Sequence, residues 1–109
     1  MLYYYMVEII DQQDFLIRGM SGSTNVLEIS EQKFSPNTIK IFNDRDIDTT
    51  RIKLLNWLST TFGLNLISTE FAWETISTSM DPGYYKVPCH KFILASKKPF
   101  TVEDIANCQ

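Results

Sequence analysis

The order of apolar and polar residues predicts several short strands in the first half of this chain of 109 residues. In residues 2–10, LYYYMVEII, apolar side chains fill both alternating sets of positions, which is typical of a strand near the centre of a sheet. The polar segment 11–14 predicts a hairpin loop, and the apolar run 15–20 predicts the returning strand. After a turn at 21–24, further strands are expected at 25–30 and 38–42.

The strongest helical pattern begins near Asp48, which we expect to be the N-cap. Ile47 and Ile52 are spaced to form a hydrophobic staple across that cap. One face of the helix would be apolar, formed by Leu54, Leu55, Leu58 and Phe62. Gly63 is the expected residue just past the C-terminus. This helix should pack on the sheet.

The second half of the chain predicts a hairpin. Residues 66–78 are rich in β-branched and aromatic side chains, which favours a strand, although a short helix from Ser68 is the alternative. A turn at 81–83 leads into a return strand at 84–96. Because that strand contains lysine and proline, which discourage pairing with another sheet, we expect it at an exposed edge.

A short terminal helix is predicted by the same kind of start signal. Thr101 would be its N-cap with Asp104 at the third helical position, and Phe100 is spaced to pack on Ile105. The whole chain therefore reads as one α+β domain, residues 1–109. Its sheet would be mainly antiparallel, with about five to six strands packed against one central helix and a short C-terminal helix.

Charge is unevenly distributed along the chain. The net charge is -3, with six basic and eleven acidic residues in 1–83, but residues 84–98 contain four lysines and no acid. Such a basic strip suits an acidic partner or a phosphate backbone. The first ten residues lack a positive start and include Glu8, so they predict neither a signal peptide nor a membrane span, and we expect a cytoplasmic protein.

The cysteines and the single histidine are the reactive candidates. Cys89 and Cys108 are too few for a secreted disulfide framework, so free thiols are favoured over a bond between them. Cys89 and His90 are neighbours, but successive side chains of a strand point to opposite faces, which argues against a catalytic dyad. Their number and spacing also do not make a zinc site, so no metal or cofactor is expected.

Two short segments resemble motifs of known families. Asp46, Asp48 and Thr50 match the DxDxT spacing of the haloacid-dehalogenase phosphatases, but the large parallel scaffold of that family is missing. Residues 90–96, HKFILAS, are similar to the start of a BTB/POZ domain, which continues with a helical domain, whereas thirteen residues remain here. Neither resemblance carries a site or a partner over to this chain.

The function predicted by elimination is that of a small non-enzymatic protein that masks the surface of a macromolecular partner by steric and electrostatic contact. Immunity proteins, antitoxins and phage-encoded inhibitors act in this way. The alternative is a nucleic-acid binder that uses the basic and aromatic strand 84–98. A homodimer through an edge strand would also fit the pattern.

The candidate contact residues fall into two groups of aromatic and charged side chains, the composition typical of binding surfaces. One group belongs to the basic strip: Tyr84, Tyr85, Lys86, His90 and Lys91. The other belongs to the acidic part of the chain: Asp44, Asp46, Glu70, Trp73 and Glu74, with Tyr3 expected nearby.

Overall fold

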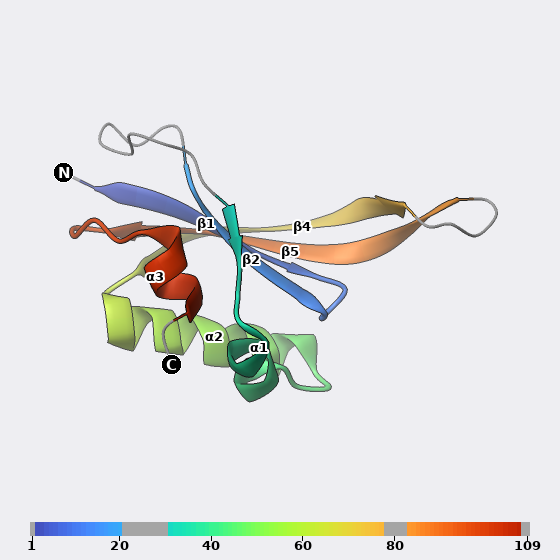
Figure 1. Cartoon of the computed structure of the whole chain (residues 1–109), viewed down its shortest axis with the longest axis horizontal. Helices are drawn as coiled ribbons and strands as arrows, with labels where there is room; N and C mark the ends of the chain where they lie inside the picture. The colour runs from blue at the N-terminus through green and yellow to red at the C-terminus, as the bar shows by residue number, and fades with distance from the viewer. Residues whose placement is uncertain (1, 21–30, 78–82, 108–109) are drawn as a thin grey trace.

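The computed structural model describes residues 2–20, 31–77 and 83–107, which form a five-stranded antiparallel sheet in the order β3-β2-β1-β5-β4. The strands are β1 (Tyr3–Ile10), β2 (Asp14–Gly19), β3 (Glu31–Lys33), β4 (Asn65–Ser77) and β5 (Tyr84–Ser96), and the helices are α1 (Pro36–Phe42), α2 (Ile47–Phe62) and α3 (Val102–Asn107). All three helices lie on one side of the sheet (Figure 1). The predicted α+β class, antiparallel sheet, central helix and short terminal helix are confirmed.

The core lies between the sheet and the helices. Its fully buried side chains include Val7, Ile9, Phe15, Ile17, Phe92, Leu94, Leu54, Leu58 and Ile105. Alternate positions of β1 and β5 supply one wall, and α2 supplies the other with the face that the sequence predicted. The intervening positions of β1 are half-buried on the opposite face of the sheet, over which none of the described helices lies.

The strand β5 is not at the edge of the sheet, contrary to the sequence prediction. It pairs with β1 on one side and with β4 on the other. Pro88 is tolerated there because the pairing with β1 ends at Cys89, one residue short of it. The Pro88 carbonyl accepts the Asp11 N–H at 2.8 Å, so the missing N–H of the proline would point to the same side, beyond the end of β1.

Residues 38–42 belong to helix α1, so the strand predicted for them is wrong. Ser35 is the N-cap and accepts the Thr38 N–H at 3.2 Å, while Pro36 occupies the first helical turn. Thr38 is buried, and Ile39 and Phe42 pack against the core from the same side. The β-branched composition favoured a strand, but the capping residues and tertiary packing produce a helix.

The N-cap of α2 is Asp46, not Asp48. The Asp46 carboxylate accepts the Asp48 N–H at 3.2 Å and the Thr49 hydroxyl at 3.0 Å. Ile47 is consequently inside the helix rather than before it, and Ile52 is 53% exposed, so the predicted staple between them is not formed around the cap. The predicted end is confirmed: Gly63 has the left-handed backbone conformation, with φ 66°.

The other predicted elements are found where the structure describes them. The loop predicted at 11–14 is found at 11–13, where it joins β1 to β2, residues 65–77 are strand rather than helix, and Thr101 caps α3 by accepting the Asp104 N–H at 3.1 Å. The strand predicted at 25–30, the turn at 21–24 and residues 81–82 of the predicted turn lie outside the described residues, as does Cys108. Within the described ranges, no helix combines the length and the apolar character needed to cross a membrane.

The hairpin of β4 and β5 extends beyond the rest of the sheet. Each strand has 13 residues, but β5 pairs with β1 only from Cys89 to Ser96. Residues 73–77 and 84–88 therefore form a two-stranded arm, which projects past the end of α2 and the β1–β2 turn (Figure 1). Trp73, Tyr84, Tyr85 and Lys86 of this arm are exposed to solvent, whereas Val87 is buried.

Candidate functional site

A group of aromatic side chains is exposed on the helix-facing side of the arm and its base. Phe71, Trp73 and Tyr84 are 53%, 61% and 60% exposed. The strand register places them on one face with Lys86, Pro88 and His90, since Phe71 pairs with His90 and Trp73 with Pro88. We call these six residues the arm face.

The rings of the arm face contact one another. The ring centroids of Phe71 and Trp73 are 5.7 Å apart at 84°, and those of Phe71 and His90 are 5.0 Å apart at 64°. Both are edge-to-face arrangements, the geometry that aromatic quadrupoles favour. The three side chains therefore form a preorganised aromatic surface.

A groove of about 320 Å³ lies at the base of the arm, where it meets the helical layer. It is lined by Gln12, Ile47, Phe71, Pro88 and His90. Ile47 is the first residue of α2, so the groove lies between that helix and the hairpin. A side chain from a partner could enter it beside the exposed rings.

The β1–β2 turn holds the groove in shape. Asp11 and Gln12 have φ values of 54° and 56°, the left-handed conformation that a tight turn requires. This geometry directs the Asp11 N–H to Pro88, and it lets the Gln12 side-chain amide donate to the Asp44 carbonyl at 3.2 Å. The Asn43 side-chain amide donates a hydrogen bond to the Gln12 carbonyl at 2.8 Å. Turn, hairpin and the start of α2 are thus linked around the groove.

His90 is held mainly in its neutral form. Partial burial lowers the pKa of its imidazole, the positive charge of Arg51 lowers it further, and Asp48 opposes them. Both charged residues belong to the first turns of α2, and they form an ion pair with each other at 3.3 Å. Near neutral pH, therefore, His90 offers an uncharged ring to a partner.

The structure separates the residues predicted from the basic strip. Tyr84, Lys86 and His90 lie on the arm face, but Tyr85 and Lys91 point to the other face of the sheet. Lys91 is neutralised by Glu74 at 3.0 Å. The hydrogen bond that the Lys91 ammonium donates to Glu74 is also the main reason that the pKa of Lys91 is raised.

The acidic group is also divided. Trp73 belongs to the arm face, whereas Glu70 and Glu74 lie on the opposite face of β4. Tyr3 was expected near the acidic residues. It pairs instead with Ser96, at the end of β5 that is distant from the arm.

Asp44 and Asp46 support the fold at the start of α2. Asp46 caps the helix, and Asp44 binds Lys53 at 3.1 Å while accepting the Asp46 N–H at 3.3 Å. The Lys53 ammonium and the Asp46 N–H lower the pKa of the Asp44 carboxyl. These contacts are structural, so neither residue is free to serve as a contact group without weakening the helix start.

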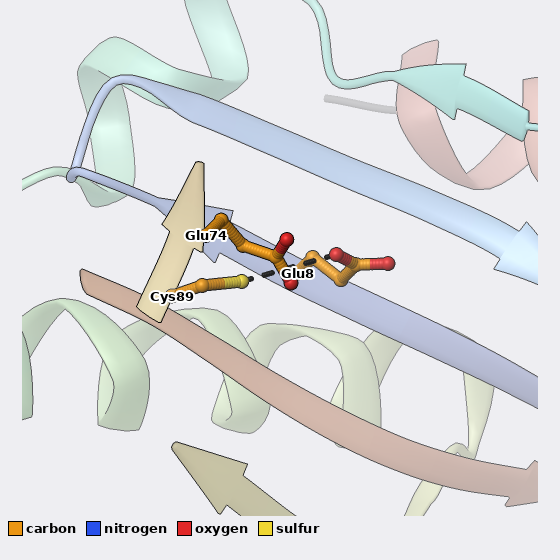
Figure 2. Close-up of side chains that lie close together, drawn as sticks. All are labelled: Glu8, Glu74 and Cys89. Atoms are coloured by element: carbon orange, nitrogen blue, oxygen red, sulfur yellow. Dashed lines mark hydrogen bonds between the residues drawn. The ribbon is translucent and has the colours of Figure 1, made fainter. Parts of the chain in front are cut away.

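Three possible metal ligands meet on the other face of the sheet. Glu8, Glu74 and Cys89 come from β1, β4 and β5, and their ligand atoms lie within 4.8 Å of one another (Figure 2). The Cys89 thiol donates to Glu8 Oε2 at 3.8 Å. Sequence spacing gave no signal for this cluster, because the three strands meet only through the register of the sheet.

The charges of this cluster are already compensated. Glu8 lies 3.9 Å from Arg18, and Glu74 binds Lys91. Burial, followed by the negative charges of Glu8 and Glu74, raises the pKa of the Cys89 thiol to about 11. A protonated, buried thiol between two paired carboxylates explains the arrangement without a metal ion.

Cys89 and His90 are on opposite faces of β5, as strand geometry required. The thiol contacts Glu8 on one face, while the imidazole contacts Phe71 on the other. They cannot exchange a proton directly in this arrangement.

The site residues predicted from the sequence did not include Phe71, Gln12 and Ile47. Phe71 had a usable signal, since it shares strand parity with Trp73. Gln12 and Ile47 had none, because only the folding of the turn and of α2 against the hairpin brings them to the groove. No protein-family model, curated protein or solved structure matches this chain.

Proposed function

We propose that this chain is a small protein-binding module without enzymatic activity, which masks the surface of a macromolecular partner with its arm face. The observation that carries the proposal is the exposure of Phe71 and Trp73 side by side, with Tyr84 exposed farther along the same face of a projecting hairpin. Clustered apolar surface of this kind is typical of interaction sites, and tryptophan and tyrosine are enriched at their energetic centres.

The geometry supports a masking role in two ways. The rings of Phe71, Trp73 and His90 are already in contact, so binding would cost little additional ordering of these side chains. Lys86 lies on the same face as the rings, where it can meet an acidic group of the partner. A module of this type would resemble immunity proteins, antitoxins and phage inhibitors in its mode of action.

The lysine positions favour a protein partner over a nucleic acid. Lys91 is paired with Glu74, so it is not available as a phosphate contact. Lys86 lies ten residues from Ser96, the last residue of β5, which is about 33 Å at about 3.3 Å per residue, and Lys97 and Lys98 follow that end of the strand. The basic strip is therefore not a continuous cationic track, and phosphate affinity depends on the number of such contacts.

The test uses a photoreactive amino acid placed at position 73 and, as a matched control, at position 41. Trp73 and Ile41 are exposed to nearly the same degree, 61% and 59%, but Ile41 lies on α1, away from the arm. In cells of the native host, we expect position 73 to cross-link to one defined protein and position 41 not to do so. Equal labelling at both positions would contradict the proposal.

A second measurement distinguishes a protein partner from a nucleic-acid partner. Retention of the purified chain on heparin or single-stranded DNA should be negligible at physiological salt. Salt-dependent retention that is lost when Lys86 and Lys91 are changed to glutamate would replace the protein partner with a nucleic acid.

A further inference from the structure

Strand β4 is the outermost strand of the sheet next to β5. In the part of the chain that the structure describes, no strand pairs with its other edge. Its register with β5 shifts between Leu66 and Ser68 and is regular from there to Ser77. A long, regular, unpaired edge is a template for an additional strand.

The backbone groups that face this free edge follow from the pairing. Pro88 directs its carbonyl away from β4, toward Asp11, and has no N–H to offer. Trp73, directly opposite Pro88, therefore forms a non-hydrogen-bonded pair with it, and the Trp73 N–H and C=O point outward. Because the direction of the backbone groups alternates along a strand, the N–H and C=O of Phe71 and Thr75 also point outward, away from β5.

The free edge lacks the residues that usually prevent strand addition. Residues 65–77 contain no lysine, arginine or proline, whereas protected edges commonly carry them. The lysines and the proline of the hairpin lie on β5, which is covered on both sides over most of its length. The irregularity at Leu66 affects only the first part of β4.

We propose that β4 binds an extended segment of a partner protein as an added strand, in which apolar and basic residues alternate. This mode rests on the proposed function and specifies how the partner is bound. Residues of the segment on the arm-face side would pack on Phe71 and Trp73, which are exposed. Those on the other side would lie beside Glu70, so a basic side chain there is complementary.

Charge also argues against a second copy of this chain as the occupant. β4 contains two glutamates and no basic residue, so pairing of two β4 strands supplies no positive partner for Glu70. Lys91 lies directly opposite Glu70 but is bound to Glu74, and Glu70 forms no ion pair with any of the described residues. A basic strand from another protein supplies what the edge lacks.

The probe is a capped eight-residue peptide in which valine and lysine alternate. Two further versions carry backbone N-methyl groups, one on every valine and one on every lysine, so that only one version loses the N–H groups that would bond to β4. We expect the parent and one methylated version to bind equally and the other at least tenfold more weakly. In two-dimensional NMR, the amides of Phe71, Trp73 and Thr75 should shift and exchange more slowly with solvent.

A pair of protein variants tests the same contacts from the other side. Thr75→Pro removes one outward N–H at an edge position that tolerates proline, and Thr75→Val keeps it. Thr75→Pro should weaken peptide binding about tenfold, whereas Thr75→Val should not. Unchanged far-ultraviolet circular dichroism and melting temperature would show that both variants fold.

The outcomes distinguish this inference from the proposed function. Equal binding of both methylated peptides, equal binding by the two Thr75 variants, or a dimer formed through β4 in ultracentrifugation would overturn strand addition. If the cross-linked partner is retained by Thr75→Pro but lost by Trp73→Ala, strand addition is wrong and the arm-face proposal stands. Retention by both variants would overturn both.

Discussion

The hydroxyl of Tyr5 bonds twice to the backbone of Phe100, ninety-five residues away. It donates to the Phe100 carbonyl at 2.7 Å and accepts the Phe100 N–H at 2.8 Å. This clamp fastens the segment before α3 to the central strand β1. Burial is the main cause of the raised pKa of Tyr5, so the hydroxyl remains a donor well into the alkaline range.

Replacing Tyr5 with phenylalanine should lower the free energy of unfolding by about 2 kcal/mol, because a carbonyl and an N–H lose their partner in a partly buried place. Urea denaturation followed by tryptophan fluorescence measures the change. Tyr3→Phe is the matched control on the same strand, and it should cost less than about 0.5 kcal/mol. Equal losses in the two variants would contradict the role of the clamp.

The corrected start of α2 predicts different costs for two neighbouring acids. Asp46→Ala removes the N-cap and should destabilise the protein by about 1 kcal/mol. Asp48→Ala removes only an exposed ion pair with Arg51, for which a few tenths of a kcal/mol are expected. Thermal unfolding of both variants measures the two losses of stability. A larger loss for Asp48→Ala than for Asp46→Ala would show that Asp48 is the N-cap.

The single histidine reports on the groove. Its NMR titration should have a midpoint below the ordinary value of 6.5, because burial and Arg51 lower its pKa. Arg51→Gln should raise the midpoint, and Asp48→Asn should lower it. Since the pKa is depressed in the folded state, this contribution to stability is present above pH 6.5 and is lost as the pH falls through the lowered pKa. A midpoint at or above 6.5 would refute this environment.

Cys89 should react slowly with iodoacetamide at neutral pH, because the thiol is fully buried and its pKa is about 11. Fast alkylation in the native state would instead support a catalytic thiol. The raised pKa also means that the contribution of Cys89 to stability is present below pH 9 and is lost as the pH rises toward 11. Unfolding free energies of the wild type and Cys89→Ala, compared across this range, measure that loss.

Substitutions on the arm face should have little effect on the free energy of unfolding. Trp73→Ala removes a side chain that is mostly exposed, so the free energy of unfolding should change by less than about 0.5 kcal/mol. Phe92→Ala, in contrast, empties part of the core on the neighbouring strand and should cost about 3–5 kcal/mol. Chemical denaturation of the two variants tests whether Trp73 belongs to a surface. A large loss for Trp73→Ala would assign it to the core.

Local pattern was sufficient for most elements of the fold. Apolar side chains at both sets of alternating positions in residues 2–10 predicted the central strand β1, the apolar stripe predicted α2, and Thr101 predicted the cap of α3. These features depend on neighbours within one or two turns of the chain, which the sequence states directly. Helix α1 was missed because its β-branched residues favour a strand, and packing of Thr38 against the core outweighs that preference.

Only part of the candidate site could be predicted from the sequence. Tyr84, Lys86 and His90 alternate along one predicted strand, so strand parity alone places them on one face, whereas Trp73 was assigned to the separate acidic group and joins them only through the pairing of β4 with β5. Their separation from Lys91, Glu70 and Glu74 follows from the same rule once β4 and β5 are paired. The groove and the Glu8, Glu74 and Cys89 cluster join three or more segments, and no spacing along the chain reveals them.

The sequence by itself determined β1, β2, β4, β5 and the main helix, and which side chains of one strand share a face, because each depends on backbone periodicity and on capping groups a few residues apart. Only the tertiary structure decided that β5 lies inside the sheet, that β4 is its edge, and that Phe71 and Trp73 face solvent. The physical reason is that exposure depends on where other layers end. Because β1 stops opposite Cys89, the remaining hairpin projects uncovered, and its aromatic residues are left available for contact.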